Sequence, residues 1–200
     1  MQRTRREIVK AIATTTAASA LPASIATSVL AQGQPQPGVD TGYSSNEILQ
    51  AGHQFFGAVS KGLAGAVEWA FQRQGRPNGY ILGEEGSGAF VAGLRYGEGT
   101  LYTKNAGTHH IFWQGPSIGV DFGAEGAKVM MLVYDLPAVQ AMYTRFAGID
   151  GSAYLVAGVG VSFLGGNNVI VAPIRSGVGA RLGANIGYLK FSDRPTWNPF

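Results

Sequence analysis

The sequence predicts a mainly β (α+β) domain, a small soluble antiparallel β-barrel of about eight strands with a long N-terminal amphipathic helix and one short helix. From Tyr80 onward, short apolar stretches alternate with a period of two between Gly, Asn and Asp turn signals. Before Tyr80, apolar residues recur instead at helical spacing. The chain also holds 30 glycines in 200 residues, which suits twisted or bent strands.

Residues 1–31 are predicted to be a signal peptide. A basic start with Arg5 and Arg6 leads into a weakly apolar Ala/Thr stretch that ends in "SVLAQ", with cleavage before Gln32. "TRREIVK" resembles a twin-arginine export signal, and an ordinary secretory signal is the alternative. Thr14–Thr16 and Pro22 interrupt any membrane-spanning run, so we expect no transmembrane anchor in the mature chain and a periplasmic location.

Removal of this leader changes the charge balance of the chain. The net charge of the whole sequence is +3. Residues 1–31 hold four basic residues and one acid, which leaves eleven of each in the mature chain. A neutral chain without a basic patch does not indicate nucleic acid as a partner. With no cysteine, the protein has no disulfide, so its stability must come from an apolar core.

A linker and a helix precede the strands. Residues 32–43 form a polar Pro/Gly linker. Residues 44–75 read as one amphipathic helix, which starts with a capping box of Ser44 and Glu47. Its glycines either allow close approach to another surface or mark a break: Gly57, Gly62, Gly65. Its apolar stripe is expected to pack on the barrel rather than to act as a mobile arm: Phe55, Val59, Leu63, Val67.

The β-barrel domain is predicted to span residues 78–192, with a C-terminal tail at 193–200. A short helix, "LPAVQAMYTRF", is expected after Asp135, and the other strands follow one another at hairpin spacing. Without further crossover helices the sheet is antiparallel, and closing it into a barrel removes exposed edges.

No catalytic, metal or cofactor site is predicted. "GPSIG" matches the hydrolase pattern around Ser117, but a strand follows in place of the required helix, and no histidine lies beyond His110. His109 and His110 are adjacent on a strand, so they face opposite sides and cannot chelate one ion. Glu84 and Glu85 fail as paired carboxylates for the same reason.

Three segments carry a resemblance to a known family. "WQGPSIGVDFGAEGAKVMMLVYD", "FAGIDGSAYLVAGVGVS" and "APIRSGVGARLGANIGYLKF" resemble the envelope integrity protein A (EipA) family of alphaproteobacterial proteins, from Tyr43 to Phe191. The resemblance implies a soluble periplasmic eight-stranded barrel that is needed for resistance to envelope stress, with no assigned enzymatic activity. A fainter similarity to SYLF lipid-binding domains rests on small residues around one tryptophan: Trp113, Pro116, Ser117, Gly119, Gly123.

The expected function is noncatalytic support of the cell envelope, through binding of a lipid, a glycan or an envelope protein. Four aromatic residues are candidates to line a ligand cavity, with core filling as their other role: Phe112, Trp113, Tyr134, Tyr154. An enzyme of unrecognised type is one alternative. The other is an outer-membrane barrel, suggested by the terminal Phe200 but opposed by the short strands and by two prolines in "DRPTWNPF".

Overall fold

The structure is a computed structural model that describes residues 41–57, 61–87, 94–116, 127–150, 152–176 and 187–196. These residues belong to one of two compact units, Pro37–Phe200. The predicted signal peptide and most of the linker lie outside the described residues. The helices are α1 (Ser45–Phe56), α2 (Lys61–Gln74) and the 3-10 helix η1 (Val139–Met142). The strands are β1 (Gly79–Ser87), β2 (Leu94–Thr103), β3 (Gly107–Pro116), β4 (Ala127–Tyr134), β5 (Arg145–Gly148), β6 (Tyr154–Val156), β7 (Val159–Val161), β8 (Leu164–Gly166), β9 (Val169–Ser176) and β10 (Tyr188–Ser192).

The segment expected as one long helix is divided into two. The predicted capping box is present at the start of α1, where Ser44 and Glu47 bond each other's backbone. Gly57 ends α1 with φ 78°, a left-handed conformation that glycine adopts without strain. The helix therefore breaks at the first of the three glycines, and α2 starts afresh at Lys61.

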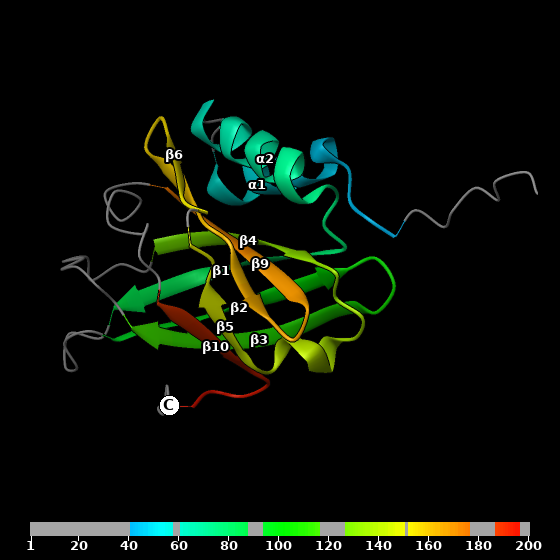
Figure 1. The fold of residues 1–200 in the computed structure, drawn as a ribbon, viewed down its shortest axis with the longest axis vertical. Helices are drawn as coiled ribbons and strands as arrows, with labels where there is room; N and C mark the ends of the chain where they lie inside the picture. Colours follow the sequence, from blue (N-terminus) through cyan, green and yellow to red (C-terminus); the bar gives the residue numbers. More distant parts are fainter. Residues whose placement is uncertain are drawn as a thin grey trace, which may run out of the picture. The chain divides into compact units, whose positions relative to one another are not determined.

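Eight strands close into an antiparallel barrel, as the sequence predicts. The strand order is β4-β1-β2-β3-β10-β5-β8-β9, and pairing of β4 with β9 closes the ring. The short hairpin of β6 and β7 branches from the end of β9, because β7 pairs with residues 174–176 of that strand. Figure 1 shows this hairpin rising beside α2.

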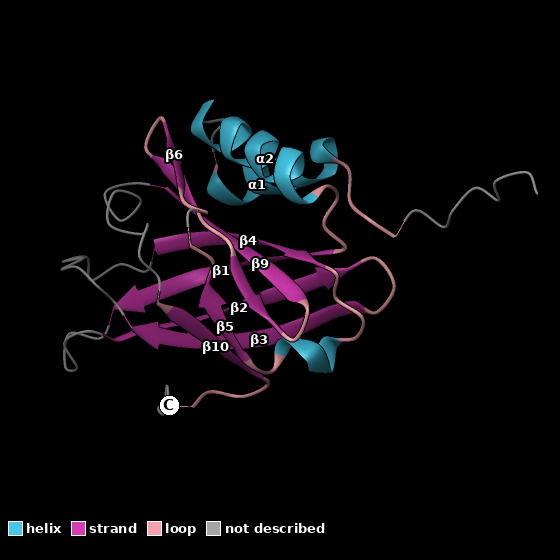
Figure 2. Ribbon diagram, in the orientation of Figure 1, coloured by secondary structure: helices cyan, strands magenta, loops and turns pink. Residues whose placement is uncertain are grey.

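Two apolar cores lie on opposite sides of the same barrel wall. In β4, Val129, Met131 and Val133 fill the barrel interior. The alternate residues Met130 and Leu132 pack outward under the helices. Both faces of β4 are therefore buried from Val129 to Tyr134, which explains why this part of its sequence is continuously apolar. Figure 2 shows the two helices on one side of the strands.

The other two helix glycines allow close packing of α2 on the hairpin. A Cβ at Gly62 would lie 2.6 Å from Val159 Cγ2 and 2.9 Å from the Val156 carbonyl oxygen. Beside it, Gly65 faces the side chain of Val156. Leu63 and Val67 of the predicted stripe are buried in the outer core, whereas Val59 lies outside the described residues. The helix pair thus covers the outside of the barrel wall.

The predicted short helix after Asp135 is a single 3-10 turn, η1. Its buried residues Val139 and Met142 belong to the core inside the barrel. Within the described ranges, none of the helices is long and apolar enough to cross a membrane.

Candidate functional site

An ionic network lies inside one end of the barrel. Glu85 on β1 accepts hydrogen bonds from Arg95 on β2 and Arg175 on β9, with Arg95 Nη1 3.1 Å from Oε1 and Arg175 Nη2 2.9 Å from Oε2. Trp113 on β3 donates its indole N–H to the same Oε2 at 3.0 Å. Arg95 Nε also donates to the carbonyl oxygen of Pro116. Four strands are thus tied together through one carboxylate.

This network keeps Glu85 ionised. Its side chain is 10% exposed. Burial raises the pKa of the Glu85 carboxyl, but Arg175 and Arg95 outweigh burial and hold that pKa below its ordinary value of 4.5. Removing one partner from such a buried pair is costly, because the remaining charge is left uncompensated. A carboxylate held in this way serves structure and is poorly suited to proton transfer near neutral pH.

Glycines on the inner faces of β1 and β2 make room for the Trp113 indole. A Cβ at Gly97 would lie 2.2 Å from Trp113 Cε2, and one at Gly83 would lie 2.7 Å from Trp113 Cη2. Gly97 tolerates no side chain unless the indole moves, and at Gly83 the carbonyl oxygen of Glu98, 2.2 Å from such a Cβ, also blocks one. These glycines therefore place the indole N–H where it reaches Glu85.

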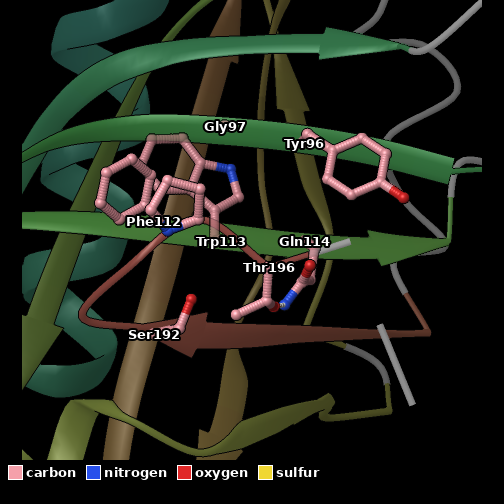
Figure 3. Close-up of a pocket in the computed structure, with 8 residues that line it drawn as sticks. Tyr96, Gly97, Phe112, Trp113, Gln114, Ser192 and Thr196 are labelled. Carbon is pink, nitrogen blue, oxygen red and sulfur yellow. Dashed lines mark hydrogen bonds between the residues drawn. The ribbon is translucent and has the colours of Figure 1, made fainter. Parts of the chain in front are cut away.

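On the other side of the same strands is a pocket. We call the outer side of β2, β3 and β10 the uncovered face, because α1 and α2 lie over a different part of the barrel wall (Figure 1). The pocket has a cavity volume of about 100 Å³. Its lining comes from β2, β3, β10 and the segment after β10: Tyr96, Gly97, Phe112, Trp113, Gln114, Ser192, Pro195, Thr196. Figure 3 shows these side chains.

Gln114 is the buried polar group of this pocket. It is 2% exposed, and its Nε2 donates to the hydroxyl of Thr196. Its Oε1 is buried and has no hydrogen-bond partner among the described residues. An unpaired buried amide oxygen costs about 1–3 kcal/mol, and Tyr134 and His53 also hold a buried polar atom without a partner among the described residues.

The structure separates the four predicted aromatic residues. Phe112 and Trp113 both line the pocket, although Trp113 also fills the barrel core. Tyr134 is buried beneath the helices, where burial raises its pKa and its hydroxyl has no partner among the described residues. Tyr154 lies on the β6 hairpin and stacks on Trp69 of α2, with 5.1 Å between ring centroids.

Sequence reasoning missed Gln114 and the role of Glu85. A glutamine between apolar neighbours in "IFWQG" was a signal for a buried amide, but nothing local indicates its partner Thr196, which lies 82 residues away. Glu84 and Glu85 do point to opposite sides of the barrel wall, since Glu84 is exposed. The network forms only in the folded barrel, where β9 lies next to β4 and Arg175 reaches across β4 to Glu85 on β1.

The remaining candidate motifs show no catalytic or metal arrangement within the described residues. Ser117 of "GPSIG" lies outside these residues. His109 Nε2 donates to the Ala106 carbonyl at 2.8 Å, and His110 lies 3.6 Å from Glu98 on the surface. No group of three or more metal-ligating side chains is found in the part of the chain that the structure describes.

Fold and site together define a closed antiparallel β-barrel with a helical cover on one face and a small pocket on another. The chain belongs to the envelope integrity protein A family, whose model matches residues 41–200. A β-barrel-like, uncharacterized protein from Brucella abortus, known from a crystal structure, is 63% identical. The match has a TM-score of 0.77 and covers 80% of this chain and 99% of that one. A comparison with curated proteins gives no match.

Proposed function

We propose that this chain is a noncatalytic periplasmic protein that supports the integrity of the cell envelope by binding an envelope component on the uncovered face. The family description supports a role in envelope integrity. The observation that carries the binding proposal is the pocket on the uncovered face, whose walls include Tyr96, Phe112 and Trp113 beside the amide of Gln114. Binding sites commonly combine apolar walls with a few polar groups of this kind.

The buried carboxylate supports a role without catalysis. Glu85 is bonded by two guanidinium groups and one indole N–H, and its pKa is lowered, so it is not poised to exchange a proton near neutral pH. An enzyme acting on envelope components would need a reactive group elsewhere. Turnover of an envelope substrate by the purified protein would contradict the noncatalytic proposal.

The leader supports export, and the route can be tested together with the function. In cells that lack the gene, wild-type protein should restore survival in a membrane-disrupting detergent. A variant with Arg5→Lys and Arg6→Lys should remain as a cytoplasmic precursor and fail to restore survival, if the twin-arginine route is used. A matched control, Arg3→Lys, leaves the arginine pair intact and should be exported normally.

One outcome would contradict this proposal, and another would change only the export route. Restoration of survival by a chain that begins at Gln32 without a leader, and stays in the cytoplasm, would contradict a periplasmic role. Normal export of the double-lysine variant would mean that the chain uses the general secretory route, and it would leave the proposed function unchanged. Native mass spectrometry of protein from its own periplasm would then show whether a lipid, a glycan or a protein copurifies.

A further inference from the structure

We propose that the ionic network inside the barrel end is also a binding site for a small anionic group, a carboxylate or a phosphate, which pairs with the guanidinium of Arg175. The network joins Arg175 to Glu85, Arg95 and Trp113. This inference is independent of the proposed function, which concerns the pocket on the outer side of the barrel wall. Failure of the anion site would leave that function unchanged.

Glu85 has no capacity left for another hydrogen-bond donor. A carboxylate offers about four lone-pair positions, two on each oxygen. Oε1 accepts from Arg95 Nη1 at 3.1 Å and from Arg175 Nε at 3.3 Å. Oε2 accepts from Arg175 Nη2 at 2.9 Å and from Trp113 Nε1 at 3.0 Å. All four positions are therefore filled by the three side chains around the carboxylate.

Arg175 uses only one edge of its planar guanidinium group to bind Glu85. Nε and Nη2 form that edge, so the edge made by Nη1 and the second hydrogen of Nη2 faces away from the carboxylate. Within the described residues, Nη1 has no hydrogen-bond acceptor. Arg95 makes further contacts of its own, so the site is assigned to Arg175. Two parallel N–H groups on one edge match the geometry of a carboxylate or a phosphate.

The network holds more positive than negative charge. Arg95 and Arg175 both form their ion pairs, in the part of the chain that the structure describes, with the single carboxylate of Glu85. Two guanidinium groups and one carboxylate leave an excess of one positive charge, on side chains that are only 8% and 10% exposed. A water molecule satisfies an open N–H group, but it does not neutralise a charge held away from bulk solvent. The excess charge therefore selects an anion over a neutral ligand.

The open edge of Arg175 can be reached from the end of the barrel. Arg175 is the next-to-last residue of β9, and Arg95 is the second residue of β2, so both lie near the end of the barrel wall. In contrast to the amide oxygen of Gln114, Nη1 of Arg175 is not among the fully buried atoms without a partner. With about one tenth of the side chain accessible, the site suits one compact charged group.

The test follows the Nε–H of Arg175 and the indole N–H of Trp113 by NMR in the purified, ¹⁵N-labelled protein. The probes are acetate, inorganic phosphate and glycerol 3-phosphate, up to roughly 50 mM, a range that covers millimolar dissociation constants. Glycerol, and sodium chloride at matched ionic strength, are the comparison arms. We expect saturable shifts at Arg175 with at least one of the three anions and none with the comparison probes. The anion that binds most tightly identifies the charged group.

A series of charge variants decides whether Arg175 holds the anion. Arg175→Gln leaves one cation for one carboxylate and should weaken anion binding at least about ten-fold. Glu85→Gln leaves both guanidinium groups without a counterion and should strengthen binding at least about ten-fold. Arg145→Gln removes an exposed arginine of β5 and is the matched control, which should bind like wild type.

Stability gives a second measurement if a variant folds poorly. An anion that binds only the folded protein raises the midpoint of urea unfolding. With the anion that binds wild type most tightly, the rise should be largest in Glu85→Gln and absent in Arg175→Gln. Equal affinity in wild type and Arg175→Gln, or no saturable shift with any anion, would overturn the assignment. Equal shifts with chloride would also overturn it, because they would mark an adventitious ion only.

Discussion

The helix-covered side of the barrel wall and the uncovered face differ in the outward-facing residues that their strands present. Under the helices, the outward residues of β4 and β9 are apolar, as in Leu132 and Ile174. On the uncovered face the outward residues include Phe112, Gln114 and Ser192. The covered side buries more apolar side chains, and it also holds buried polar atoms without a partner, as in Tyr134, whereas on the uncovered face Gln114 lies beside a pocket. The comparison teaches that an unpaired buried polar atom does not by itself distinguish the two sides, and that the pocket does.

On the covered side, Leu63→Asp is expected to cause the largest loss of stability. Leu63 is 2% exposed in the core between helices and barrel, so an unpaired charge there should lower the free energy of unfolding by about 3–5 kcal/mol. Urea denaturation measures the loss. Gln72→Asp, exposed on the same helix, should change stability by less than about 0.5 kcal/mol. Wild-type stability in Leu63→Asp would mean that α2 is a detachable arm.

Inside the barrel, Glu85→Gln removes the charge that Arg95 and Arg175 share. We expect a loss of about 2–4 kcal/mol near neutral pH, because two buried guanidinium groups remain without their counterion. The pKa of Glu85 is lowered in the folded protein, so its contribution is present above the ordinary value of 4.5 and is lost as the pH falls through the folded value. The stability gap between wild type and variant should therefore narrow in acid. A gap that widens in acid would contradict the assignment.

Gly97→Ala tests whether the position of the Trp113 indole, which fills the barrel core and also lines the pocket, depends on the absence of a side chain at Gly97. The new Cβ would collide with the Trp113 indole, and we expect a loss of about 1–3 kcal/mol from overpacking. The indole N–H signal should shift as its bond to Glu85 lengthens. Gly86→Ala, where a Cβ meets nothing within 4 Å, is the control. Equal stability of the two variants would show that the indole relocates freely.

The smallest expected effect is at the ion pair that links Glu47 of α1 to Lys104 of the barrel. Glu47 accepts hydrogen bonds from Lys104 at 2.7 Å and from the Ser44 backbone at 2.7 Å, with the bond from Lys104 the largest cause of a pKa lowered to about 2. Because the group is exposed, Glu47→Gln should cost less than about 1 kcal/mol. The wild-type advantage should vanish as the pH falls from 4.5 towards 2. A larger loss of stability would mean that this ion pair is a main contact between the helices and the barrel.

The barrel could be predicted because its strands carry local signals. Alternation marks β2 and β3, and the continuously apolar β4 is explained by burial on both faces. The helix break at Gly57 was one of two open readings, since a helix glycine alone does not reveal whether it ends the helix or lets another surface approach. Gly57 does the first and Gly62 the second.

The pocket could not be predicted, because its parts meet only through long-range pairing. Gln114 reaches Thr196 because β3 pairs with β10, for example Gln114 with Lys190. The sequence analysis placed Tyr134 and Tyr154 in one cavity with Phe112 because all three are aromatic residues in or near predicted strands. Their actual surroundings depend on which outer side of the wall each strand presents, and no local pattern carries that information.

The position of β10 in the ring has a consequence for how the chain is made. β10 follows the other nine strands in chain order, yet it sits between β3 and β5. During synthesis the ring stays open between these two strands until β10 has left the ribosome. The high share of distant pairings slows this last step. Closure of the barrel therefore has to wait for β10, and a pause or truncation before Tyr188 leaves two unpaired strand edges available for aggregation.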